Sequence, residues 1–149
     1  MIEQFVRPST SFVNSAGLRI GIVIARNNLR NIGSIFGHAY ELLTKTGVAR
    51  ENIHVVSVPH SYDLVHVAKS MVGDNAYDVI VCLGNVPGGA ACLNLPIEDI
   101  ATQGFQWVAF YAGTPVVFCV TRDQEQNDAE LMKRGAECAQ TALRLARSF

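Results

Sequence analysis

The chain has 149 residues, a formal net charge of −1 and a pI near 6.4, with 49% hydrophobic and 17% charged residues. This length predicts one domain with a real core, and the lack of a basic field argues against nucleic acid as a partner. The low share of charged residues leaves surface that subunits can bury between them, so we expect a homo-oligomer.

Residues 1–17 are expected to form an N-terminal arm, followed by an α/β domain over residues 18–149. The arm holds two short apolar pieces, Phe5–Val6 and Phe12–Val13, which can pair with the sheet edge of another subunit. Acidic Glu3 and the absence of an apolar core run argue against a signal peptide. No window approaches the roughly 20 apolar residues of a membrane span. We therefore expect a cytoplasmic protein without membrane contact.

The first half of the domain begins with a strand at residues 18–24, LRIGIVI, because continuous β-branched runs are typical of strands buried on both faces. A helix is predicted at about 29–46, where apolar residues recur at spacings of three and four. The run IHVVSV at 53–58 predicts a second strand, which Pro59 ends. A short helix follows from Leu64 on the same periodic grounds.

The second half repeats this alternation. A third buried strand, VIVCLG, is predicted at 79–84, and a helix at 97–108 follows a loop that contains glycines. The run PVVFCV at 115–120 predicts a fourth strand, and an apolar stripe over 132–146 predicts a final helix. Four strands alternating with four helices predict right-handed βαβ units, with a four-stranded, mostly parallel sheet covered on both faces.

In open parallel sheets the ligand crevice lies beyond the carboxyl ends of the strands. The candidate segments are therefore those that follow the predicted strands: residues 26–28, 59–63, 85–95 and 121–126. The third of these, GNVPGGAACLN, pairs two glycines just before a predicted helix. Glycine backbones and helical N–H groups suit a phosphate or carboxylate, although a plain turn is the alternative interpretation.

The segment after the second strand carries a titratable imidazole, a hydroxyl, a phenol and a carboxylate on four consecutive residues, His60, Ser61, Tyr62 and Asp63. His60 is a candidate for acid–base work. In the alternative interpretation, Ser61 caps the following helix and Asp63 lies in its first turn. A Ser–His–Asp hydrolase finds no support, because no G-x-S-x-G motif occurs.

The four cysteines are widely spaced and form no C-x-x-C motif: Cys82, Cys92, Cys119 and Cys138. No histidine cluster of metal-site form accompanies them. We expect small buried apolar residues in a reducing compartment, no metal site and no cofactor.

Taken together, the segments RIGIVIARNN, GVARENIHVVSVPHSYDL, YDVIVCLGNVPGG, PVVFCVT and KRGAECAQTAL resemble lumazine synthase, the penultimate enzyme of riboflavin biosynthesis, over about residues 18–146. The resemblance implies a flavodoxin-like, three-layer α/β/α fold and assembly into pentamers or larger shells. It also implies a transferase that joins a ribitylamino-pyrimidinedione to dihydroxybutanone phosphate, a sugar-phosphate-like anion, at sites shared by adjacent subunits.

The resemblance further implies the site residues. Those that meet the pyrimidine and the ribityl chain are Asn27, Asn28, Ser61, Tyr62, Asp63, Val86, Pro87 and Phe118. The glycine pair at a crevice position assigns the phosphate to Gly88, Gly89, Ala90 and Ala91, and the resemblance adds Arg134, where a Lys usually precedes the Gly. His60 is the crevice histidine that we propose for proton transfer.

Several family groups are replaced here. Asn27 stands where an aromatic residue normally stacks on the pyrimidine, and the loop pattern G-x-V-I-R-G-x-T-x-H-F survives only in three residues, Gly84, Val86 and Gly89. Leu93 takes the place of the acid–base His. The phosphate-binding Arg of the family has no counterpart here, and Arg122 is the nearest cation in the sequence. We therefore expect weak activity that depends on positioning. The alternatives are a non-catalytic oligomeric scaffold, a flavin-binding or other ligand-binding member, and the archaeal type of riboflavin synthase.

Overall fold

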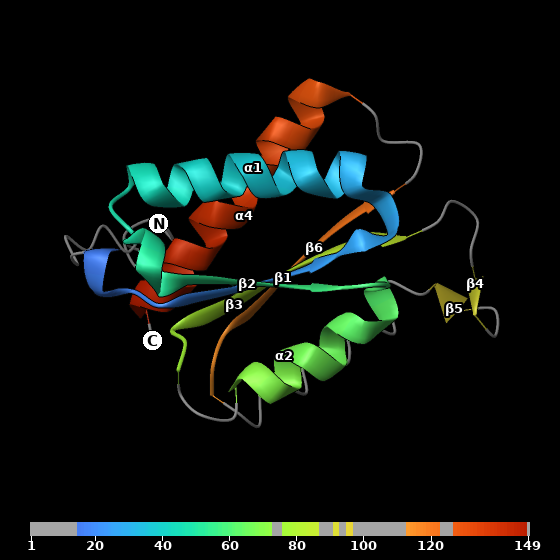
Figure 1. Cartoon of the computed structure of the whole chain (residues 1–149). Coiled ribbons are helices and arrows are strands. Elements are labelled where there is room, and N and C mark those ends of the chain that lie inside the picture. Colours follow the sequence, from blue (N-terminus) through green and yellow to red (C-terminus); the bar gives the residue numbers. More distant parts are fainter. Residues whose placement is uncertain are drawn as a thin grey trace, which may run out of the picture.

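The computed structural model describes residues 15–72, 76–86, 91–92, 95–96, 113–122 and 127–148. The main sheet has four parallel strands in the order β2-β1-β3-β6. Their bounds are β1 (Ile20–Ala25), β2 (Ile53–Val58), β3 (Val79–Val86) and β6 (Val116–Arg122). A small antiparallel pair, β4 (Ala91–Cys92) and β5 (Leu95–Pro96), lies on the carboxyl side of this sheet (Figure 1).

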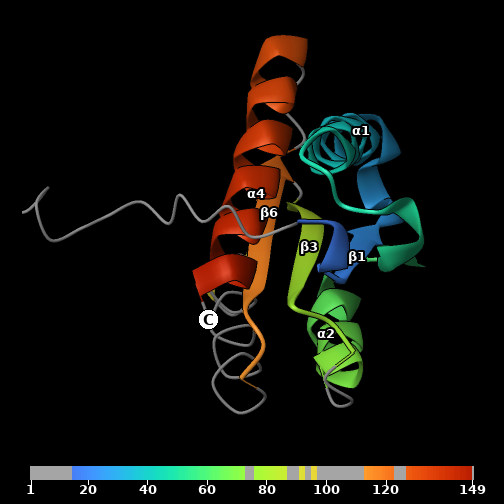
Figure 2. The ribbon, with the colours of Figure 1, turned by 90° about the vertical axis from the view of Figure 1, so that its left-hand side faces the viewer.

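Three described helices cover the sheet: α1 (Leu29–Lys45), α2 (Leu64–Val72) and α4 (Asp128–Ser148). Figures 1 and 2 show α1 and α4 on one face and α2 on the other. Short 3-10 turns occur at Ser15–Gly17, Arg26–Asn28, Arg50–Asn52 and Ser61–Asp63. The predicted three-layer α/β/α fold with a four-stranded parallel sheet is therefore confirmed.

Alternation along the central strand β1 explains the two cores. Ile20 and Ile22 belong to the core under α1 and α4, whereas Val23 and Ala25 belong to the core under α2. Because β1 and β3 each have a neighbour on both sides and helices on both faces, only apolar side chains suit most of their positions. β2 is the edge strand of the described sheet, and its middle residues are exposed.

The ends of α1 and α4 depend on local polar groups. At the start of α1, the side chain of Asn28 accepts a hydrogen bond from the Asn31 N–H at 3.3 Å. Gly47 lies shortly after the last residue of α1 and has a φ of 104°, a conformation that favours glycine. Asn127 accepts from the Ala129 N–H at 2.9 Å, so α4 begins at Asp128 rather than at the first residue of its apolar stripe.

The predicted element bounds are correct to within a few residues. The strand at 53–58 is confirmed without change, whereas β3 runs two residues beyond the predicted end at Gly84. It does so because Asn85 and Val86 still pair with Thr121 and Arg122 of β6. The predicted helix at 97–108 and most of the predicted arm lie outside the described residues.

Candidate functional site at the carboxyl ends of the strands

The carboxyl ends of β1, β2 and β3 bring together four polar side chains. Asn27 and Asn28 lie in the turn after β1, Ser61 lies in the turn after β2, and Asn85 is the penultimate residue of β3. Ser61 and Asn85 are 7% and 1% exposed, while the two asparagines after β1 are half-buried. We call these four residues the amide cluster, and they form the inner part of the described crevice.

Ser61 closes the end of β3. Its hydroxyl accepts a hydrogen bond from the Asn85 N–H and donates to the Asn85 carbonyl, both at 2.8 Å. Pairing between β1 and β3 ends at Leu83, so the backbone groups of Asn85 have no β1 partner and need another one. The prediction that Ser61 caps α2 is therefore wrong.

Asn85 also orients the two asparagines after β1. Its backbone carbonyl accepts from the Asn27 Nδ2 at 3.0 Å, and its side-chain oxygen accepts from the Asn28 Nδ2 at 3.2 Å. Sequence reasoning placed Asn85 at the start of a candidate segment but did not single it out. An asparagine inside an otherwise apolar strand run was the available signal, because buried amides need hydrogen-bonding partners.

Asp63 and His60 lie at the outer side of the cluster. The Asp63 carboxylate accepts from the His60 backbone N–H at 3.3 Å, and the Asp63 N–H donates back to the His60 carbonyl at 3.0 Å. Asp63 therefore holds the turn that begins α2, as the alternative interpretation expected, and His60 is exposed beside it.

Gly84 permits the close approach of the surrounding side chains. A Cβ on this residue would lie 2.9 Å from Leu64 Cδ1, 3.2 Å from Phe118 Cε2 and 3.3 Å from Ser61 Oγ. Phe118 is partly buried against the core under α2 and thus lies near the cluster. Only a glycine leaves room for Phe118 and Ser61 together.

Arg134 is the one predicted phosphate residue whose side chain is described. It projects from α4 and donates to the Val120 carbonyl, near the carboxyl end of β6. Ala91 is described only as part of β4, and the side chains of Tyr62, Val86 and Arg122 lie outside the described part. Pro87, Gly88, Gly89 and Ala90 also lie outside the described residues.

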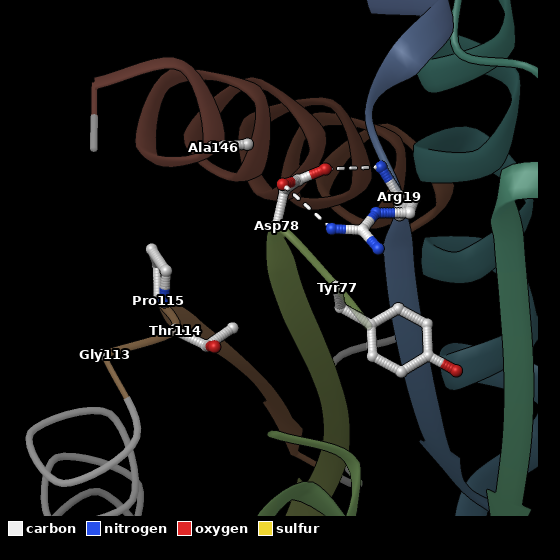
Figure 3. Close-up of a pocket in the computed structure, with 7 residues that line it drawn as sticks. All are labelled: Arg19, Tyr77, Asp78, Gly113, Thr114, Pro115 and Ala146. Atoms are coloured by element: carbon white, nitrogen blue, oxygen red, sulfur yellow. Dashed lines mark hydrogen bonds and ion pairs between the residues drawn. The ribbon is translucent and has the colours of Figure 1, made fainter. Parts of the chain in front are cut away.

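A separate cavity of about 190 Å³ lies at the opposite end of the sheet, by the starts of β1, β3 and β6 (Figure 3). Its lining residues are Arg19, Tyr77, Asp78, Gly113, Thr114, Pro115 and Ala146. The Asp78 carboxylate accepts from the Arg19 backbone N–H at 2.8 Å and lies 3.8 Å from the Arg19 guanidinium. These two charges offset each other and link β1 to β3. The cavity is distinct from the crevice because it lies at the other end of the sheet.

The described thiols are structural. Cys82, Cys119 and Cys138 form no disulfide bond, and the first and last are buried, as the sequence predicted for them. Burial raises the pKa of Cys82, and a hydrogen bond with Cys119, together with burial, raises the pKa of Cys138. Neither thiol is therefore a ready nucleophile at neutral pH.

Metal binding and membrane crossing find no support within the same described ranges. No group of three or more His, Cys, Asp or Glu side chains in them could hold a metal ion. None of the described helices is long and apolar enough to cross a membrane.

Two comparisons with known proteins identify the same family. The family model for 6,7-dimethyl-8-ribityllumazine synthase matches residues 17–149. A 6,7-dimethyl-8-ribityllumazine synthase from Desulfatibacillum aliphaticivorans is 33% identical over 106 residues, which cover 71% of this chain and 68% of that protein. Among solved structures, an ornithine carbamoyltransferase from Gloeobacter violaceus is 18% identical with a TM-score of 0.38. That match covers 80% of this chain but only 33% of the other, and supports no functional conclusion.

Proposed function

Because this chain belongs to the 6,7-dimethyl-8-ribityllumazine synthase family of riboflavin biosynthesis, as its sequence predicted, we propose that it is a slow lumazine synthase. In this proposal it joins a ribitylamino-pyrimidinedione to dihydroxybutanone phosphate in the crevice beyond the carboxyl ends of the strands. The observation that carries the proposal is the amide cluster, since it presents oriented polar groups where ligands of open parallel sheets bind.

The proposed mechanism is positioning. Holding two reactants in the right geometry can lower a barrier by about 7–11 kcal/mol, whereas a general acid or base typically contributes about 10²- to 10⁴-fold. Asn27, Asn28 and Asp63 would hold the pyrimidine and ribityl parts, and Phe118 would form an apolar wall near them. The phosphate would bind at the backbone of residues 87–91 and at Arg134.

Proton transfer is the weak part of this site. Leu93 has no titratable group at the position where the family pattern carries its histidine. His60 is exposed and lies three residues before Asp63, so we propose it as the substitute acid–base group. Water is the alternative proton carrier.

The experiment is the condensation rate of the purified protein, compared with the uncatalysed reaction under the same conditions. We expect a native rate above this background, a loss on the order of 10²-fold or less in His60→Gln, and a gain in Leu93→His. A native rate equal to background would contradict the proposal. An unchanged rate in His60→Gln would remove His60 from the mechanism but leave positioning intact.

A second candidate is a non-catalytic member that binds a flavin or a related ligand, or that serves as an oligomeric scaffold. Asn27 favours this candidate. It stands where the resemblance implies a stacking aromatic residue, but its amide is hydrogen-bonded to β3 and offers no aromatic surface to a pyrimidine. Binding of a lumazine without condensation would favour this candidate.

We also propose that the protein forms pentamers or larger assemblies. Val55 and Val56 on the edge strand β2 are 43% and 37% exposed, which leaves an apolar strand edge for a partner. The arm of a neighbouring subunit, through Phe12 and Val13, is the proposed occupant. Removing residues 1–14 should then loosen the assembly and lower its number of subunits, and an unchanged number of subunits would rule this pairing out.

A further inference from the structure

Ser61 has one hydroxyl proton and two acceptors within reach. Its oxygen lies 2.8 Å from the Asn85 carbonyl oxygen and 3.3 Å from the Asn27 side-chain oxygen. The shorter contact is the better hydrogen bond, so the proton goes mainly to Asn85. The Asn27 oxygen is left with a long, shared contact and keeps its capacity to accept another hydrogen bond.

The orientation of the Asn27 amide is set by the backbone. Its nitrogen donates to the Asn85 carbonyl at 3.0 Å, and a carbonyl can only accept. Turning the amide over would bring two oxygens together, which is unfavourable. Asn27 is half-buried in the turn after β1, so part of this residue remains accessible to solvent.

Asn28 is used differently. Its nitrogen donates to the Asn85 side-chain oxygen at 3.2 Å, and its oxygen accepts from the Asn31 N–H at the start of α1. Asn28 therefore ties β3 to α1, whereas Asn27 presents an acceptor of fixed direction.

We propose that Asn27 determines ligand specificity: its side-chain oxygen accepts a hydrogen bond from a ring N–H of the bound pyrimidinedione. This inference rests on the proposed function, because it names how the same crevice selects its ligand. A hydrogen bond thus takes over at a position where the family resemblance implies aromatic stacking. A ligand without a donor at that ring nitrogen would leave the Asn27 oxygen poorly satisfied and would bind more weakly.

The test uses a ribitylamino-pyrimidinedione in which a nitro group replaces the reactive amine, so that it binds but cannot condense. Its two ring N-methyl derivatives each lack one N–H donor. Dissociation constants are measured by titration calorimetry for the native protein, Asn27→Leu and Asn27→Phe. Asn52→Leu is the matched control, because Asn52 also donates from its side chain to a backbone carbonyl, that of Ala16, at 3.0 Å in a distant turn.

We expect methylation at one ring nitrogen to weaken binding to the native protein about fivefold to tenfold more than it weakens binding to Asn27→Leu. Asn27→Phe should bind the parent compound without this discrimination, and Asn52→Leu should behave as the native protein. Equal weakening in the native protein and both Asn27 variants would overturn the inference while leaving the proposed function standing. A native protein that binds none of the three compounds would overturn the proposed function and the inference with it.

Discussion

Asn85 accepts hydrogen bonds from Asn27 through its backbone carbonyl and from Asn28 through its side-chain oxygen. Ser61 completes the arrangement by bonding both backbone groups of Asn85. A single buried residue thus connects the turns after β1 and β2 to the end of β3. At the residue scale, the geometry of the candidate site depends on this connection.

We predict that Asn85→Ala lowers the free energy of unfolding by about 1–3 kcal/mol. The change removes the acceptor of the Asn28 amide at a position that is 1% exposed, where water cannot easily replace it. Urea denaturation measures the effect, and Asn52→Ala, in a less buried turn, should cost less. Equal stabilities of Asn85→Ala and the native protein would show that the side chain does not hold the cluster.

At the element scale, the contact between α1 and α4 depends on one glycine. A Cβ on Gly135 would lie 2.6 Å from the Ile35 carbonyl oxygen and 2.9 Å from His38 Cβ. Backbone atoms cannot move aside as a flexible side chain can, so the two helices would have to separate. This close approach explains physically why a glycine follows Arg134 in the KRG segment.

We predict that Gly135→Ala destabilises the protein by about 1–3 kcal/mol through overpacking. Gly37→Ala is the matched control, since Gly37 is an exposed glycine of α1 with nothing within 4 Å of an added Cβ. This second change should stabilise the protein by about 0.5–1 kcal/mol, because alanine favours the helix. Chemical denaturation measures the free energy of unfolding of both variants, and we expect their m-values to be unchanged. Similar changes in this free energy for both variants would rule out the close contact.

Prediction from sequence succeeded where a local pattern reports burial. The β-branched runs of β1 and β3 are covered on both faces, so their composition alone identified them. It failed where the partner of a residue is distant in the sequence. Ser61 fits the pattern of a local helix cap, yet its hydroxyl bonds the backbone of Asn85, because the pairing of β3 with β1 stops at Leu83. Sequence also brought Asn27, Asn28 and Ser61 to one crevice, but it did not identify Asn85 as the residue that joins them.

At the scale of the whole molecule, we propose an assembly in which each subunit offers one crevice. The low share of charged residues and the exposed apolar edge of β2 both support burial between subunits. If adjacent subunits share the sites, ligand occupancy and assembly are coupled, because whatever binds only the assembled state stabilises it.

The most direct test of this account is the native mass of the protein at saturating 6,7-dimethyl-8-ribityllumazine, since one spectrum counts both subunits and bound ligands. We predict a number of subunits that is a multiple of five, with one ligand for each subunit. A stable monomer at micromolar concentration, or an intact assembly that carries no ligand, would contradict the account.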